Sequence, residues 1–397
     1  MLVPAPAPIS PAIDLMTIFS RLLPITLAFL GASALAEPTR VYFGTYTGGD
    51  SGSRGIYTSL FDSATGELGE PRLAAETVNP SFLAIHPDAG LLFAVNEVHH
   101  GPGRGNASVV AYRIAADGEL TRINEQATGG GTACHCVVDA TGRFLLVANY
   151  TGGNVAVLPI AADGTLSEAS CVIDHEGSSV NPRRQRQPHA HSINLSRDNR
   201  FAYAADLGID QIRVYRFDDT TGQLSPTDPG FVAVPAGGGP RHFALHPGGG
   251  WAYTNLELTS AVTGFRRDPD TGGLTVLNTW PTVPESVDAS NNTTAECVVH
   301  PSGRFLYVSN RGHDSIAVFR IDESTGQLGL VEVTPSGGRT PRNFCIDPTG
   351  KWLLSANQES DSIVVYQIDP EEGSLATTGN RVSVGRPVCV RFVPQTR

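Results

Sequence analysis

The chain has 397 residues and a formal net charge of −11 at neutral pH. Because an acidic surface repels nucleic-acid phosphates and anionic lipid headgroups, neither nucleic acid nor a membrane is an expected partner. The 43 glycines and 28 prolines are typical of many short strands joined by tight turns.

The first 36 residues are predicted to be a secretory signal peptide. From Met16 the chain reads MTIFSRLLPITLAFLGASALA, a short apolar run that ends in an A-x-A cleavage site. Residues 1–15 lack the usual basic start, so we place the initiator at Met16. An uncleaved membrane anchor is the alternative, but no later segment is long and apolar enough to cross a bilayer. We expect cleavage after Ala36 and a periplasmic or secreted protein without membrane contact.

The remaining chain, 38–397, contains six copies of one strand–turn–strand pattern. Each copy has an apolar strand, a polar turn near a His or Asp, and a second strand that usually ends in Asn or Asp. The copies read SFLAIHPDAGLLFAVNE (81–97), CHCVVDATGRFLLVANY (134–150), HSINLSRDNRFAYAADL (191–207), RHFALHPGGGWAYTNLE (241–257), ECVVHPSGRFLYVSNR (296–311) and RNFCIDPTGKWLLSANQ (342–358). A period near 50 residues with strand patterning predicts a β-propeller.

Each copy continues with a third strand and with a fourth that begins at a turn such as DGEL (117–120) or TGQL (221–224). Four strands make one propeller blade. Three N-terminal strands (40–46, 55–61 and 66–73) and one C-terminal inner strand (387–394) remain after the six copies. We therefore predict an all-β, seven-bladed propeller whose seventh blade is closed by both ends of the chain, which hides the sheet edges.

The six cysteines are interpreted as buried free thiols, although export would permit disulfides. Four of them lie in inner strands of different repeats, where small apolar residues are expected: Cys136, Cys297, Cys345 and Cys389. No C-x-x-C spacing is present, so structural zinc is not expected. In the segment Cys134-His135-Cys136, strand alternation places the two thiols on one face and the imidazole on the other.

The open ends of the hairpins carry ionisable residues that differ between copies. Positions −5 and +11, counted from the repeat His or Asp, lie equally far from the turn, so both should emerge at one rim of the central channel. The residues at this rim are Ser81, Cys134, His191, Arg241, Ala295 and Arg342 at −5; Phe82, His135, Ser192, His242, Glu296 and Asn343 at −4; and Glu97, Tyr150, Leu207, Glu257, Arg311 and Gln358 at +11. The turn ends are nearly constant, and we interpret their histidines as structural turn caps: His86, His246 and His300.

This rim is the predicted site. Arginine offers a permanent charge and forked donors for a carboxylate, a phosphate or a developing oxyanion, which suits Arg241, Arg311 and Arg342. His191 and Glu257 can take or give a proton if burial tunes them. No G-x-S-x-G elbow is present, so a serine hydrolase is disfavoured. The pattern suits water attack on an ester or the reverse ring closure; interblade ion pairs are the structural alternative.

Two longer segments, 173–190 and 281–295, each precede an inner strand and should lie over the same face of the ring. The first contains the basic run Arg183-Arg184-Gln185-Arg186, just before His189. Such a run is often simply solvated. Its place beside the predicted mouth favours a role in drawing in an anionic substrate, and we include Arg186 among the binding residues.

Four segments closely resemble the seven-bladed propeller lactonase family: VNPRRQRQPHAHS (180–192), GPRHFALHP (239–247), FLYVSNRGHDSIAVF (305–319) and PRNFCIDPTGKWLLSANQ (341–358). The namesake members are propeller-type 6-phosphogluconolactonases, and fungal carboxymuconate-lactonising enzymes are relatives. The resemblance covers 40–395 and implies hydrolysis of a sugar-acid lactone without a metal or another cofactor.

The relatives that cyclise muconates suggest an active set of one His, one Glu and two Arg. Matching by repeat position places this set on His191, Glu257, Arg241 and Arg311, the residues that the hairpin geometry also selects. In the working mechanism the two arginines hold the lactone carbonyl, while His191 or Glu257 activates water. The remaining predicted substrate-binding residues are His135, His189, His242, Glu97, Arg342 and Arg186.

Two features set this chain apart from the expected pattern. Leu256 stands where the other copies have Asn or Asp, directly before Glu257, and could reorient that carboxylate. The predicted leader would keep the enzyme away from a phosphorylated lactone made in the cytosol, so an unphosphorylated or carboxylated lactone is a possible substrate. A lactonising cycloisomerase and a non-catalytic sugar-acid- or protein-binding propeller remain open alternatives. A calcium-dependent propeller is less favoured because acidic ligands do not cluster in the sequence.

Overall fold

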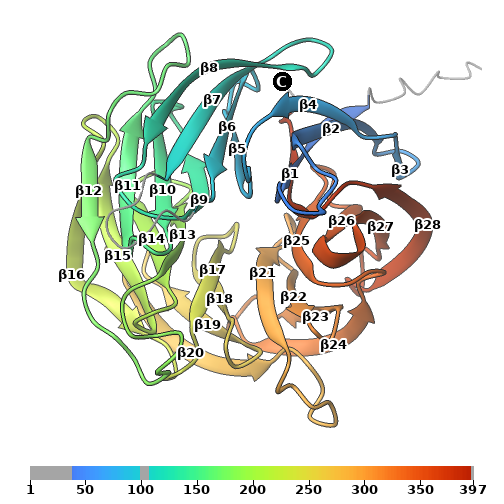
Figure 1. Ribbon diagram of the computed structural model, residues 1–397. Helices are drawn as coiled ribbons and strands as arrows, with labels where there is room; N and C mark the ends of the chain where they lie inside the picture. The colour runs from blue at the N-terminus through green and yellow to red at the C-terminus, as the bar shows by residue number, and fades with distance from the viewer. Residues whose placement is uncertain (1–37, 99–106, 395–397) are drawn as a thin grey trace, which may run out of the picture. The chain divides into compact units, whose positions relative to one another are not determined.

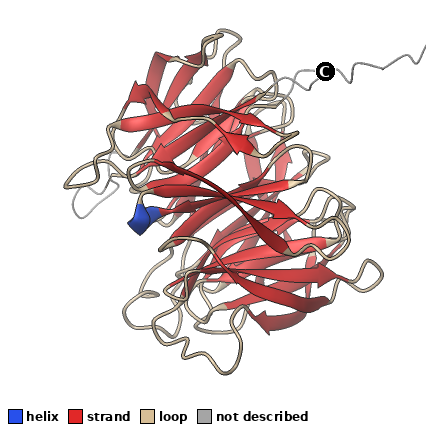
Figure 2. Ribbon diagram, turned by 90° about the vertical axis from the view of Figure 1, so that its right-hand side faces the viewer, coloured by secondary structure: helices blue, strands red, loops and turns tan. Residues whose placement is uncertain are grey.

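A computed structural model describes residues 38–98 and 107–394 of the protein. Its seven antiparallel sheets are arranged around a common axis (Figure 1), which confirms the predicted seven-bladed β-propeller. The predicted signal peptide, 1–36, lies outside the described residues. Within them nearly all regular structure is strand, and the single helical element is the 3-10 turn η1 (Gln358–Ser360; Figure 2).

Six blades follow the six sequence copies, and each has four strands. The first three are β5 (Leu83–Ile85), β6 (Leu91–Asn96), β7 (Ser108–Ile114) and β8 (Leu120–Ala127); β9 (Ala133–Val138), β10 (Phe144–Asn149), β11 (Asn154–Pro159) and β12 (Cys171–Asp174); and β13 (Ala190–Leu195), β14 (Phe201–Asp206), β15 (Gln211–Asp218) and β16 (Gln223–Ala233). The next three are β17 (Pro240–Leu245), β18 (Trp251–Leu256), β19 (Ala261–Arg267) and β20 (Leu274–Pro281); β21 (Thr293–Val299), β22 (Phe305–Arg311), β23 (Ser315–Ile321) and β24 (Leu328–Pro335); and β25 (Pro341–Ile346), β26 (Trp352–Asn357), β27 (Ser362–Ile368) and β28 (Leu375–Ser383).

The seventh blade joins the two ends of the chain, as predicted. Its strands are β1 (Thr39–Thr45), β2 (Gly55–Asp62), β3 (Glu67–Leu68), β4 (Arg72–Glu76) and the C-terminal β29 (Pro387–Phe392). β29 is the inner strand and pairs antiparallel with β1, Val41 lying opposite Phe392. The outer strand predicted over 66–73 is instead divided into β3 and β4, both of which pair with β2.

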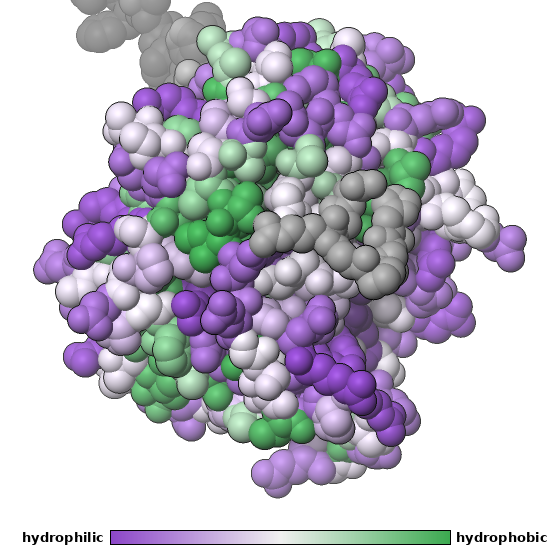
Figure 3. All heavy atoms as spheres, turned by 60° about the vertical axis from the view of Figure 1, so that its left-hand side comes forward, coloured by the Kyte–Doolittle hydropathy of each residue, from purple (hydrophilic) through white to green (hydrophobic). Residues whose placement is uncertain are grey.

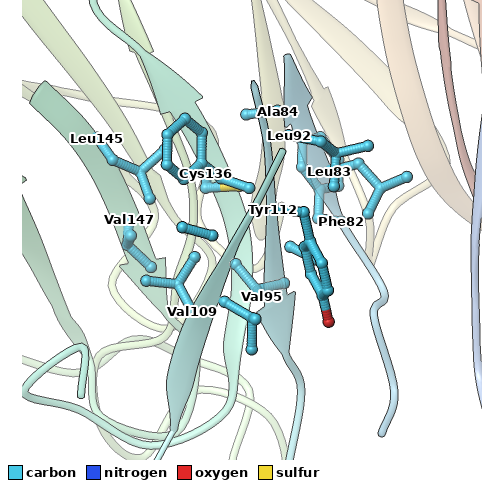
Figure 4. Close-up of a cluster of buried hydrophobic side chains, with 14 of the residues drawn as sticks. Phe82, Leu83, Ala84, Leu92, Val95, Val109, Tyr112, Cys136, Leu145 and Val147 are labelled. Atoms are coloured by element: carbon cyan, nitrogen blue, oxygen red, sulfur yellow. The ribbon is translucent and has the colours of Figure 1, made fainter. Parts of the chain in front are cut away.

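Apolar residues of neighbouring blades pack against each other between the sheets. Figure 4 shows the cluster between the first two copies, where Cys136 lies among Leu145, Val147 and Leu92. All six cysteines are free, and Cys134, Cys136, Cys297 and Cys389 are buried. The interpretation of the inner-strand cysteines as buried free thiols is therefore confirmed for Cys136, Cys297 and Cys389, whereas Cys345 is only half-buried.

Polar contacts fix each blade to the next at the turns. The Tyr307 hydroxyl donates to the Gly373 carbonyl of the following blade, and three other blades repeat this bond through Tyr42, Tyr203 and Tyr253. A Cβ on Gly373 would lie 2.4 Å from the Phe305 ring, and its φ of +75° also favours glycine.

The repeat histidines make a second set of contacts between blades. Nε2 of His86 donates to the Gly142 carbonyl of the next blade, while Nδ1 accepts from the Asp88 amide. His246 and His300 repeat both bonds. The structural role predicted for these three histidines is confirmed.

On the face in Figure 3 hydrophilic residues predominate, and apolar residues form separate patches. In residues 38–98 and 107–394 no helix is long and apolar enough to cross a membrane.

The tyrosine contacts predict a measurable stability effect. Tyr307→Phe leaves the buried Gly373 carbonyl without this donor and should lower the free energy of unfolding by about 1–2 kcal/mol. Urea denaturation followed by fluorescence measures the change. Tyr57→Phe, on an outer part of a blade, is the control and should have a smaller effect. Equal stabilities of the Tyr307 variant and the native protein would contradict the role of this bond.

Candidate active site

A β-bulge at the start of the inner strands builds the predicted rim. In β13 the pairs Ala190–Asp206 and Ser192–Ala205 leave His191 as an extra residue. Arg342 is the extra residue in β25, and Cys134 in β9. In β17 the two residues 241 and 242 occupy the same kind of irregularity. Because a bulge re-aims a side chain, positions −5 and −4 need not point to opposite faces as regular alternation requires.

Glu257 is the centre of the site. It follows β18 directly, and its side chain is 5% exposed. Its Oε2 lies 3.0 Å from Nε of Arg241 and 3.0 Å from a terminal nitrogen of Arg311. Its Oε1 accepts a 2.6 Å hydrogen bond from Arg184. The sequence prediction thus brings Glu257, Arg241 and Arg311 together correctly, and Leu256 does not prevent this.

The buried carboxylate is ionised because the arginines surround it. Burial by itself raises the pKa of Glu257, but Arg311, Arg241 and Arg184 together lower it from the ordinary 4.5 to about 2. Burial lowers the pKa of Arg311 to about 10, which leaves this group charged at neutral pH. Glu257 is therefore a poor proton acceptor and a strong anchor for guanidinium groups.

Two guanidinium N–H groups in this cluster lack a hydrogen bond. Nε of Arg311 is buried without a partner, and Nε of Arg241 is not aligned for a hydrogen bond despite its distance to Glu257. One terminal nitrogen of each arginine is held by the backbone, since Arg241 donates to the Ala295 carbonyl and Arg311 to that of Thr294. Unpaired buried donors are uncommon in native structures, so these two N–H groups require an explanation.

His191 lies beside the same carboxylate. Its Nε2 is 4.0 Å from Oε2 of Glu257, beyond hydrogen-bond distance, and its ring packs edge-on against Tyr150. Burial, followed by the charge of Arg241, holds the pKa of His191 well below 6.5. The imidazole is therefore neutral at physiological pH, with one of its two ring nitrogens unprotonated.

Two other predicted residues, His242 and His135, lie next to His191 in a series of ring contacts: His242 packs against His191, and His135 packs against His242. Nδ1 of His242 donates to Glu296 at 2.6 Å, and its Nε2 accepts from Arg241 at 3.1 Å. His135 packs on Phe82 at 4.1 Å between ring centroids. These residues line a cavity of about 400 Å³. His242 supports Arg241, and His135 has no contact with Glu257.

Glu97 and Arg342 form a separate part of the mouth. Arg342 donates to the Tyr46 hydroxyl at 2.7 Å, and this hydroxyl donates to Glu97 at 2.8 Å. Glu97 and Arg342 were predicted from the repeat, whereas Tyr46 was not, because it follows β1 in the blade that lacks the repeat pattern.

The loop between β12 and β13 covers one side of the site. Its Arg184 donates to Glu257 and to the Tyr150 hydroxyl, and its side chain is 40% exposed. His189 stacks on the Tyr150 ring at 4.4 Å. Arg186, which the sequence analysis selected, is exposed and bonds to the Pro182 carbonyl instead. The basic run therefore does reach the mouth, but through Arg184.

The prediction from strand alternation that Cys134 lies on the same strand face as Cys136 is wrong. Cys136 packs in the core cluster of the first two copies, whereas Sγ of Cys134 contacts Ala190 and His191 of the following blade. The bulge at Cys134 breaks the alternation between these two residues. Among the described residues no three His, Cys, Asp or Glu side chains are grouped so that they could hold a metal ion.

Comparison with known proteins identifies the class. Residues 40–392 match the family described as "Lactonase, 7-bladed beta-propeller". The chain is 37% identical over 356 residues to the 6-phosphogluconolactonase of Bacillus subtilis, covering 89% of this chain and 98% of that one. It is 32% identical over 311 residues to the 6-phosphogluconolactonase of Formosa agariphila, covering 77% and 85%.

A solved structure agrees with these sequence relatives. The periplasmic gluconolactonase of Pseudomonas aeruginosa superimposes with a TM-score of 0.83 and 37% identity, covering 90% of this chain and 99% of that one. The chain therefore belongs to the seven-bladed β-propeller lactonase family. Its enzyme class is that of the lactone hydrolases.

The pKa of Glu257 predicts acid sensitivity. A carboxylate whose pKa is lower in the folded chain stabilises the fold above its unfolded value, and this stabilisation is lost as the pH falls from about 4.5 to about 2. The urea midpoint of the native protein should fall through this range, and that of Glu257→Gln should fall less steeply. Glu67→Gln, at an exposed position, should follow the native protein. Parallel curves for Glu257→Gln and the native protein would contradict the assignment.

Proposed function

We propose that the protein hydrolyses the ring ester of a sugar-acid lactone that carries an anionic group, and that the reaction takes place at Glu257, Arg241, Arg311 and His191. The observation that carries this proposal is the pair of buried, unbonded Nε–H groups of Arg241 and Arg311 beside a neutral His191. Donors of this kind stabilise the negative charge that develops on a carbonyl oxygen.

In the proposed reaction a water oxygen attacks the lactone carbonyl carbon, and its proton passes to Nε2 of His191. Arg241 and Arg311 stabilise the resulting oxyanion. The bond between the carbonyl carbon and the ring oxygen then breaks, and the protonated His191 returns the proton to the leaving alkoxide. Glu257 keeps the guanidinium groups in place and does not act as the base, since its pKa of about 2 makes it too weak.

The charge of the mouth favours an anionic substrate. Four guanidinium groups, those of Arg184, Arg241, Arg311 and Arg342, face two carboxylates, those of Glu257 and Glu97. This local excess of positive charge stands in a chain whose net charge is −11. A phosphate or a second carboxylate on the lactone would neutralise it.

Arg241→Ala and Arg311→Ala should each lower kcat about 100-fold, because each removes a donor to the oxyanion. Hydrolysis is followed in a pH-stat, with the spontaneous rate subtracted. Arg304→Ala is the matched control: Arg304 belongs to the same blade as Arg311 but lies at the turn end, where it bonds to Pro370 and Glu371. Native turnover in both site variants would overturn the proposed role.

Arg184→Ala should raise KM about tenfold for an anionic lactone and leave KM for neutral gluconolactone nearly unchanged, because it removes one exposed charge from the mouth. Arg186→Ala provides the control within the same basic run and should behave like the native protein. A KM increase of the same size for neutral and charged lactones would mean that Arg184 does not recognise the anionic group.

We further propose export to the periplasm or the medium. The leader in residues 1–36 and the similarity to the periplasmic gluconolactonase of Pseudomonas aeruginosa support this localisation. The chain starting at Glu37, in the presence of EDTA, should be tested on 6-phosphogluconolactone, gluconolactone and a lactone with a free carboxylate. Turnover highest on a charged lactone supports the substrate class, whereas highest turnover on gluconolactone contradicts it.

A further inference from the structure

The thiol of Cys134 lies on the Nδ1 side of the His191 ring. It is 6% exposed. Its Sγ lies 3.3 Å from the His191 carbonyl oxygen and 3.7 Å from the carbonyl oxygens of Ala148 and Ala190. The same sulfur lies 3.8 Å from Nδ1 of the His191 ring. The ring also hydrogen-bonds to the backbone of His191 itself, which only Nδ1 can reach.

The hydrogen-bond donors and acceptors around this sulfur determine whether it donates to Nδ1 of His191 or accepts from it. A thiol has one hydrogen, and the three carbonyl oxygens can only accept. The shortest contact, to the His191 carbonyl, is therefore the place for the S–H. The sulfur lone pairs then face Nδ1, and a favourable contact requires that Nδ1 carries the ring proton.

We propose that Cys134 is a positioning residue that holds His191 in the tautomer protonated at Nδ1, so that Nε2 presents its lone pair to the substrate water. This inference rests on the proposed function, because it assigns the form in which His191 acts as base. Which ring nitrogen carries the proton is normally set by the partner of the other nitrogen, and here that partner is a sulfur.

The Glu257 carboxylate favours the other tautomer of His191, with the proton on Nε2. At 4.0 Å from Nε2 it would favour a proton on that nitrogen. Three guanidinium groups already compensate its charge, and two of them lie on the same oxygen that faces His191. The remaining attraction for an Nε2 proton is therefore weak, and the contact of Nδ1 with Cys134 acts together with the bond to the His191 backbone to favour a proton on Nδ1.

A nucleophilic role of Cys134 does not fit the surroundings. The sulfur is enclosed by carbonyl oxygens, which repel a thiolate, and burial raises the pKa of the thiol. Cys134 lies near Nδ1 of His191, whereas Nε2, the other ring nitrogen, lies near Glu257. Cys134 thus acts through the imidazole and does not touch the substrate.

The first test is a measurement on the native chain. In protein labelled with ¹⁵N-histidine, the nitrogen shifts of His191, assigned by comparison with His191→Gln, should show a protonated Nδ1 and an unprotonated Nε2 at pH 7. Cys134→Ala should shift the signals toward a mixture of tautomers. Cys136→Ala, at a buried thiol two residues further on, should leave them unchanged. A native His191 protonated at Nε2 would overturn the proposal, even if the Cys134 variant fails to fold.

Kinetics supply the second test. Cys134→Ala should lower kcat about tenfold with little change in KM, a part of the 10²–10⁴-fold contribution of a general base. Cys134→Ser should recover most of this loss, because a hydroxyl can also donate to the carbonyl and accept from Nδ1. Native kcat and an unchanged tautomer in Cys134→Ala would overturn the role of the sulfur. Full activity of His191→Gln would instead refute the proposed base and leave the tautomer result standing.

Discussion

The site depends on the cost of burying a charge. A carboxylate enclosed as fully as Glu257 must be neutralised, and in this protein guanidinium groups from two neighbouring blades and a loop supply the compensation. This requirement determines where Arg241, Arg311 and Arg184 lie. It also leaves donors of the two inner arginines free, because one carboxylate cannot satisfy every N–H around it. The same interaction thus joins two neighbouring blades and is the basis on which we propose that the arginines bind an oxyanion.

Residues that are similar in all blades lie at the turn ends of the inner hairpins, and residues that differ between blades lie at their open ends. At the turn end, tyrosine, histidine and glycine make the same contact from blade to blade, as Tyr307 does with Gly373 and His86 with Gly142. At the other end, equivalent positions carry cysteine, histidine or arginine. A repeated scaffold can tolerate this variation because the blade contacts at the turn end do not involve the rim residues. A fold defined by repetition can therefore hold a single asymmetric site.

Much of this arrangement could be predicted from the sequence. The repeat predicted seven blades and the closing strand, and the equal distance of −5 and +11 from the turn brought Glu257, Arg241 and Arg311 together. Arg184 was missed because its loop has no periodicity, so nothing in the sequence distinguished it from Arg186. The strand face predicted for Cys134 was wrong because alternation assumes a regular strand. The bulge at Cys134 adds a residue to the strand and so changes the direction of its side chain, which the sequence does not reveal.

The seam of the ring passes through the site. Tyr46 directly follows β1, the strand that pairs with the C-terminal β29, and its hydroxyl connects Arg342 of the sixth copy with Glu97 of the first. The mouth is therefore complete only when the last strand of the chain has joined the first. A chain still being synthesised lacks that strand and with it the closed circle. The pairing that closes the ring thus also fixes the position of Tyr46 between Arg342 and Glu97, so one side of the mouth is built by the joined ends of the propeller.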